Sequence, residues 1–203
     1  MTLSLPRLSL LLILAALELA CRDAPQSSRQ IEAGRYGADS IIIVDGDTTY
    51  IVDSDDWELL SAAKDARQTL AEFIRRLREP PETQTELALK VRFAELSGGV
   101  ADSVVEHLWL DVFDFDGSRF RGFLETPPND LRRVRMGDTI VVDSAQVSDW
   151  YAVDRDTLVG GFSIRVFRDR LNAKQRADED RNRPYVVNGR ALDEYRRIRA
   201  LRP

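Results

Sequence analysis

The sequence predicts an α+β fold in which one amphipathic helix packs on a curved antiparallel sheet of about five to six strands, which can curl toward a barrel. One long segment, residues 55–79, has helical periodicity, and shorter segments after it alternate between apolar and polar residues with turn signals between them. The composition, 43% hydrophobic and 31% charged residues with a net charge of −5, is globular rather than disordered and does not suggest nucleic-acid binding.

The first β-rich segment, residues 41–52, has two β-branched runs on either side of Asp45-Gly46-Asp47. A hairpin is the simplest interpretation, because Asp-Gly pairs favour tight turns between strands. A single buried strand, with the second run leading into the helix, is the alternative.

The predicted helix begins at Asp55, whose side chain can cap it in a box-like arrangement with Glu58. Pro80-Pro81 ends it, because proline lacks an amide donor and crowds the preceding turn. The apolar residues between these limits share one helix face, which needs a partner surface. They are Leu59, Ala63, Ala66, Leu70, Phe73 and Leu77.

The sheet begins with ELALKVRF, residues 86–93, where strict alternation predicts one buried and one wet face. Turn residues at Gly98-Gly99, Asp116-Gly117 and Gly137-Asp138 separate the segments that follow. The further predicted strands are residues 104–113, 118–124, 139–142, 146–153 and 159–167.

The N-terminal residues 1–20 have one early cation, Arg7, and an apolar run of about ten residues, which suits a signal peptide better than a membrane span. The ending Leu19-Ala20-Cys21 resembles a bacterial lipoprotein signal, in which the cysteine is lipidated. We therefore expect a lipid-anchored protein of the bacterial cell envelope, with residues 21–39 as a flexible tether. Ordinary secretion to the periplasm, or an uncleaved anchor, is the alternative.

Residues 169–203 form a predicted charged C-terminal extension, because the chain from 168 onward holds eleven Lys/Arg and six Asp/Glu. A solvated face is the simplest interpretation. A basic face that touches anionic lipid or the acidic part of the domain is the alternative. Residues 191–201 can form a short helix with Leu192, Tyr195 and Ile198 on one side.

The ordered segments DDWELLSAAKDARQTLAEF, LKVRF, EHLWL, RFRGFL, GDTIVV, VSDWY and GGFSIRVF resemble the YegJ-like bacterial family, a domain of unknown function. The resemblance covers residues 40–168. It implies the fold and the extent of the domain and carries no activity.

The candidate binding surface comprises His107, Trp109, Asp149, Trp150 and Arg165, which are aromatic or charged residues on predicted strands. Such a face suits recognition of an anion or peptide. The favoured function is a non-catalytic binding module with an unknown protein or small-molecule partner. A small hydrolase that uses His107 with Asp149 or Glu106, or an inhibitor or immunity-like protein that masks a basic partner, is the alternative.

No metal or cofactor is predicted. One histidine and one cysteine cannot build a zinc site, and Asp111, Asp114 and Asp116 lack the spacing of a calcium loop. Gly160-Gly161 is not a phosphate loop, because no lysine follows it and no helix is expected to begin there; it indicates a turn or a close backbone approach.

Overall fold

The computed structural model describes residues 30–32, 40–44, 47–51, 55–96 and 103–201, and it divides the chain into two units, residues 1–53 and 54–203. The first unit holds a three-stranded antiparallel sheet in the order β1-β2-β3. β2 (Ser40–Val44) and β3 (Asp47–Ile51) form the predicted hairpin. β1 (Gln30–Glu32) lies within the segment expected to be a tether, whereas the signal segment and Cys21 fall outside the described residues.

The second unit confirms the predicted α+β class, with an antiparallel sheet that curls into a half-barrel. The strand order is β7-β6-β5-β4-β8-β9. The strands are β4 (Gln84–Leu96), β5 (Ser103–Phe115), β6 (Arg119–Leu124), β7 (Thr139–Asp143), β8 (Val147–Asp154) and β9 (Thr157–Gly160). The helices are α1 (Trp57–Gln68), α2 (Leu70–Arg78), α3 (Phe162–Arg170), α4 (Ala173–Asn182) and α5 (Ala191–Ala200).

The single predicted helix is two consecutive helices, α1 and α2, which meet at the buried Thr69. The Thr69 hydroxyl donates to the carbonyls of Asp65 and Ala66, and the indole N–H of Trp150 donates to Ala66 O at 3.1 Å. These side-chain bonds add to those of the Thr69 amide N–H, which lies 3.0 and 3.2 Å from the same two carbonyl oxygens, at the end of α1 where helix carbonyls lack regular partners. The cap is Asp56 rather than Asp55: its carboxylate accepts the amide N–H groups of Glu58 and Leu59.

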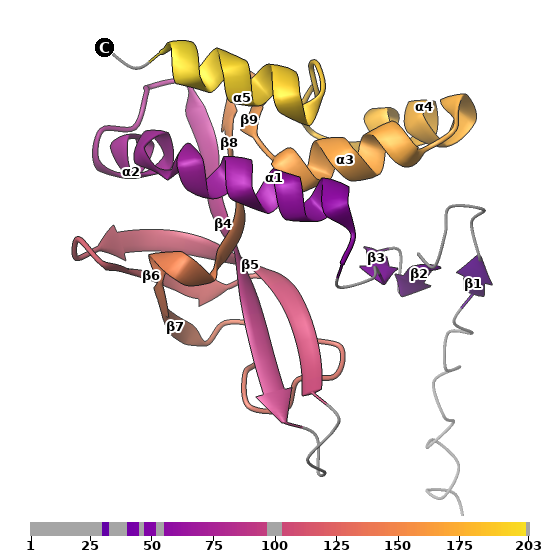
Figure 1. The fold of residues 1–203 in the computed structure, drawn as a ribbon, viewed down its shortest axis with the longest axis horizontal. Helices are drawn as coiled ribbons and strands as arrows, with labels where there is room; N and C mark the ends of the chain where they lie inside the picture. The colour runs from indigo at the N-terminus through magenta and orange to yellow at the C-terminus, as the bar shows by residue number, and fades with distance from the viewer. Residues whose placement is uncertain (1–29, 33–39, 45–46, 52–54, 97–102, 202–203) are drawn as a thin grey trace, which may run out of the picture. The chain divides into compact units, whose positions relative to one another are not determined.

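The inner face of the sheet is the core. Figure 1 shows α1 and α2 running across the sheet, with α3 and α5 beside α1. Phe73 of α2 meets Phe120 and Trp150 edge-on, with ring centroids 5.6 and 6.0 Å away. The other buried strand residues of this face include Leu89, Val91, Leu108, Leu110, Leu124 and Val142. Of the predicted apolar stripe, Ala66, Leu70 and Phe73 are buried here and the other three residues are half-buried, while Ala62 rather than Ala63 is buried beside them.

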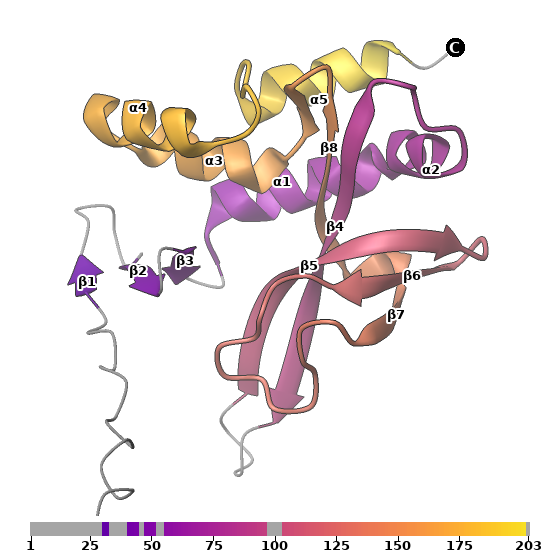
Figure 2. The ribbon, with the colours of Figure 1, turned by 180° about the vertical axis from the view of Figure 1, so that it is seen from behind.

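The ends of β4 and β5 reach beyond the helices, as Figure 2 shows, and a loop covers part of their inner face. Glu106 accepts the amide N–H groups of residues 129–131 at 2.6 to 3.0 Å, and Glu95 accepts those of residues 132 and 133. Leu131 is buried as a result. The two carboxylates give the loop backbone hydrogen-bond partners that it otherwise lacks.

Two expectations for the C-terminal part are corrected. Residues 159–167 are not a strand: β9 ends at Gly160 and α3 begins at Phe162. Residues 169–203 are not an extension outside the domain, since α5 packs on α1, α3 and β9 through the buried Ile198. The expected helix at 191–201 is present, and α4 buries no residue, as expected for a solvated helix.

Candidate functional site on the outer face of the sheet

The five residues of the predicted surface do not lie on one face. His107 and Trp109 point away from the helices, because Leu108 and Leu110, which alternate with them along β5, are buried in the core. Trp150 lies on the inner face and is fully buried, with its indole bonded to α1. His107 and Trp109 therefore lie on the outer face of the sheet, whereas Trp150 lies in the core.

Asp149 is a buried structural carboxylate. It accepts the amide N–H groups of Phe162 and Ser163 at 3.0 and 2.7 Å and the Ser163 hydroxyl at 2.6 Å, and so holds the first turn of α3 against β8. It also accepts the amide of Trp150. Burial raises the pKa of Asp149, while Ser163, Lys90 and the backbone N–H groups oppose that shift.

Arg165 lies in α3 and is buried, so it cannot belong to an exposed contact surface. Its guanidinium donates to the carbonyls of Leu158, Gly160 and Asn188, and Glu194 lies 3.5 Å away. In a strand over residues 159–167, Arg165 would alternate with Ile164 and Val166 and face away from them. A helix instead turns Arg165 into the joint between β9, α3 and α5.

The backbone amides at the Gly160-Gly161 turn are bonded to groups of the chain itself. Both glycines have positive φ, 73° and 63°, and a Cβ at Gly160 would lie 2.5 Å from the carbonyl oxygen of Trp150. The amide of Gly160 donates to Glu194, and the amides that begin α3 donate to Asp149. The amide groups that in other proteins bind a phosphate are here paired with two carboxylates of the chain itself.

His107 does not form a catalytic pair with either expected partner. Glu106 is bonded to the loop on the inner face, Asp149 is bonded to α3, and the residue opposite His107 on β4 is Arg92. Although His107 is exposed, desolvation followed by the charges of Lys90 and Arg92 lowers its pKa to about 4. The ring is therefore neutral near pH 7, and none of the described residues gives it the carboxylate bond that orients a catalytic imidazole.

Lys90 lies between the outer face of the sheet and the contact of Asp149 with α3. Its ammonium lies 5.1 Å from the centroid of the Trp109 ring and 5.8 Å from that of Phe167, and it donates to Ser163 Oγ at 3.4 Å. Burial lowers the pKa of Lys90, and Asp149 opposes this. Trp109 is thereby fixed from one side by a cation–π contact.

An aromatic row crosses the outer face beside Lys90. The ring of Trp109 meets that of Tyr151 edge-on at 4.9 Å, and Tyr151 lies 6.2 Å from Tyr185 of the loop between α4 and α5. The small Ala88 stands opposite Tyr151 and Asp111 in the ladder and forms the floor of the row. Each of the three rings is half-buried, so each keeps a solvent-facing part.

Three carboxylates, those of Glu86, Asp111 and Glu125, surround the row. Burial raises the pKa of Glu125, and the charges of Asp111 and Glu86 raise it further. Burial also raises the pKa of Tyr151, with Glu86, Tyr185 and Glu125 acting in the same direction. Glu86 accepts the Tyr151 hydroxyl at 3.2 Å. Within the described part of the chain none of the three carboxylates has an ion pair. We call the six residues the outer patch: Glu86, Trp109, Asp111, Glu125, Tyr151 and Tyr185.

Sequence reasoning found Trp109 but missed the rest of the outer patch and Lys90. Lys90 and Glu86 were assigned correctly to the wet face of their strand, and VSDWY contains Tyr151. These residues are brought together by the strand register, which places Lys90 opposite Trp109 and Ala88 opposite Tyr151. The register is a property of paired strands and not of one segment. Tyr185 carried no local signal.

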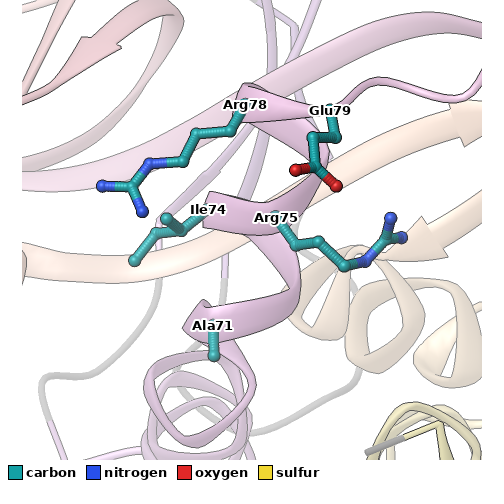
Figure 3. Close-up of a pocket in the computed structure, with 5 residues that line it drawn as sticks. All are labelled: Ala71, Ile74, Arg75, Arg78 and Glu79. Atoms are coloured by element: carbon teal, nitrogen blue, oxygen red, sulfur yellow. The ribbon is translucent and has the colours of Figure 1, made fainter.

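Two surface hollows offer no alternative site. The larger, about 480 Å³, lies beside β9 and α5, and its charges are matched by the pairs Arg76–Asp154 and Arg197–Glu194. The smaller, about 240 Å³, lies on α2, where Figure 3 shows Arg75 and Arg78 extending to opposite sides. Neither is lined by histidine, cysteine or serine.

The described residues contain no group of three or more His, Cys, Asp or Glu that could hold a metal ion. In the same residues, every helix is too short or too polar to cross a membrane.

A family model described as "Uncharacterized protein conserved in bacteria (DUF2314)" matches residues 56–183, more than half of the chain. The chain belongs to this family. The match begins at the cap of α1, beyond the β2–β3 hairpin, and ends just after α4. It therefore differs from the expected extent, residues 40–168, at both ends.

A protein of Neisseria meningitidis serogroup B with an ankyrin repeat name is 30% identical over 134 residues. The match covers 64% of this chain and 53% of the relative, so the chain spans about half the length of that relative. No solved structure matches the chain.

We expect Asp149→Asn to lower the free energy of unfolding by about 2–4 kcal/mol, because a neutral amide cannot accept four donors and leaves buried N–H groups unpaired. Urea unfolding followed by circular dichroism measures this. The control is Asp111→Asn on the outer face, which should change the stability by less than about 0.5 kcal/mol. Equal stabilities of the two variants would contradict the structural role of Asp149.

We expect His107 to titrate near pH 4 in an NMR experiment, rather than near its ordinary value of 6.5. Since the folded-state pKa lies below the unfolded one, His107 stabilises the fold fully above about pH 6.5, and this contribution is lost as the pH falls toward 4. Arg92→Gln should move the midpoint upward, whereas Arg119→Gln, on β6, should not. A midpoint near 6.5 in the unmodified chain would be inconsistent with this environment.

Proposed function

We propose that the chain is a non-catalytic binding module, displayed on a bacterial membrane, whose outer patch binds a positively charged segment of a protein partner. We also propose the finer family assignment, YegJ-like, which the sequence resemblance supports. The proposal rests on one observation: an aromatic row with solvent-facing edges stands among three carboxylates that have no cation partner in the described part of the chain.

The chemistry of the outer patch favours a cation. Arginine and lysine stack on aromatic rings and pair with carboxylates, and aromatic anchors carry much of the binding energy at protein interfaces. Each carboxylate raises the cost of ionising its neighbours, as the raised pKa of Glu125 indicates, and a bound cation would relieve this. The same carboxylates would repel an anion.

The Neisseria relative supports a protein partner. Its name refers to ankyrin repeats, which form extended binding surfaces, and this chain matches only about half of its length. A domain that shares a chain with such repeats fits a role in recognition.

The two alternative functions differ in their support. A hydrolase based on His107 lacks the acidic partner that it requires, since Glu106 and Asp149 are bonded elsewhere. An inhibitor that masks a basic partner would use the same outer patch, and the carboxylates favour it. It is the second candidate, and loss of a partner's activity on binding would distinguish it from a simple receptor.

Trp109→Ala should weaken binding of an arginine-rich decapeptide by about tenfold or more, because Trp109 supplies the aromatic surface next to the carboxylates. Fluorescence anisotropy of the labelled peptide with the detergent-solubilised full chain measures this. The matched control is Trp57→Ala, whose side chain is 75% exposed at the start of α1, and it should bind as the unmodified chain does. A glutamate-rich peptide that binds as well as the arginine-rich one would count against the proposal.

Metabolic labelling with a radioactive fatty acid should mark the full chain when it is expressed in a bacterium, because Leu19-Ala20-Cys21 resembles a lipoprotein signal. Cys21→Ala should abolish the label and release the protein from the membrane fraction. Ala16→Ser, upstream of that ending, should leave the label in place. Persistent labelling of the alanine variant would refute the anchor.

A further inference from the structure

β7 is an edge strand whose outward backbone is unpaired. The amide of Leu124 donates to Asp138 O at 3.0 Å and that of Ser144 donates to Ser118 O at 3.3 Å, so even-numbered residues of β7 pair with β6. The N–H and C=O groups of Thr139 and Val141 consequently point away from the sheet. In the described residues nothing bonds to them. The opposite edge differs, because Val186 bonds along β9.

An exposed apolar strip leads across the outer face to this edge. Phe113, Phe123 and Val141 are 48, 46 and 50% exposed, and the two phenyl rings lie 4.9 Å apart. Val141 stands on the outermost strand, opposite Arg121 and diagonal to Phe123, whose own ladder partner is Thr139. Unpaired strand edges and exposed apolar patches both mark association surfaces.

The charges at the two ends of the edge are compatible with a second copy. The exposed Asp143 is the last residue of β7, and the exposed Arg135 and Asp138 stand just before its first residue. When a second copy runs antiparallel to the first with Val141 on the two-fold axis, Asp143 of each copy faces the uncharged Thr139 of the other.

We propose that β7 pairs antiparallel with β7 of a second copy of this chain, with Val141 facing Val141 on the two-fold axis. Two hydrogen bonds then join the Val141 residues, and two more run from Thr139 N–H to Asp143 C=O, while the Asp143 amide keeps its bond to Gln146. The two six-stranded sheets become one continuous sheet, and the apolar strips meet across the axis. Because the paired strands are short, the dimer is reversible and concentration-dependent.

A foreign strand fits this edge less well than a second copy. The β7 residues whose backbone groups point away from the sheet are odd-numbered and centred on Val141. A two-fold axis through Val141 therefore matches every free N–H donor with a free C=O acceptor. A parallel pair would instead bring the Asp143 carboxylates of the two copies to the same end of the edge. The strip adjoins the outer patch, since Phe123 stands opposite Asp111 in the ladder, but the pairing of β7 uses no residue of that patch.

Sedimentation equilibrium of the detergent-solubilised full chain tests the dimer. The protein mass, corrected for detergent, should rise toward twice the chain mass with concentration. Val141→Lys places two ammonium groups opposite each other at the axis and should weaken association at least tenfold. Val105→Lys is the matched control, an exposed valine on β5 away from the edge, and should associate as the unmodified chain does. Circular dichroism confirms that both variants fold.

A second measurement does not depend on a disruptive charge. In a Cys21→Ser background, Val141→Cys should cross-link to a covalent dimer with a short bis-maleimide, because paired Cα atoms lie about 5.5 Å apart. Val105→Cys should remain monomeric. A chain that stays monomeric at its highest soluble concentration, or a dimer that is insensitive to Val141→Lys and fails to cross-link through Cys at 141, would overturn the proposal.

Discussion

The carboxylate of Asp149 holds α3 against β8, and much of the second unit depends on this contact. Helix amides that lack partners at an N-terminus favour negative charge, and Asp149 supplies it from a strand, thirteen residues before Phe162. Glu194 supplies a second carboxylate to the amide of Gly160. Together they fix the turn between β9 and α3, and the buried Arg165 and Glu194 then join α3 to α5.

The contact between Asp149 and α3 also affects which ligands the protein can bind. Lys90 lies between Ser163, which is bonded to Asp149, and the Trp109 ring. The side chain that faces the buried carboxylate thus also positions an aromatic side chain of the outer patch. The glycine turn, by contrast, has no free amide for a phosphate, because the chain's own carboxylates already bind there. Ligand recognition is thus directed to the open face of the sheet.

Periodicity predicted the α1–α2 segment, the strands and the apolar face correctly, because these depend on residues a few positions apart. It could not predict α3: FSIRVF alternates like a strand, and the helix forms because Asp149 caps it from a distant strand. In the candidate site, alternation already separates Trp150 from Asp149, since adjacent strand residues face opposite sides. The pairing of Lys90 with Trp109, and the approach of Tyr185, required the register and the packing of α4 and α5.

The outer face is electrically divided, and this division favours an oriented partner. Arg92 carries a positive charge at one end, and His107 opposite it stays neutral, so the positive end does not grow as the pH falls from 7 to about 5. Glu86, Asp111 and Glu125 make the other end negative around the aromatic row. A basic segment that stacks on Trp109 is therefore repelled at one end of the face and attracted at the other. Its position along the sheet is fixed by charge, while the rings supply the contact area.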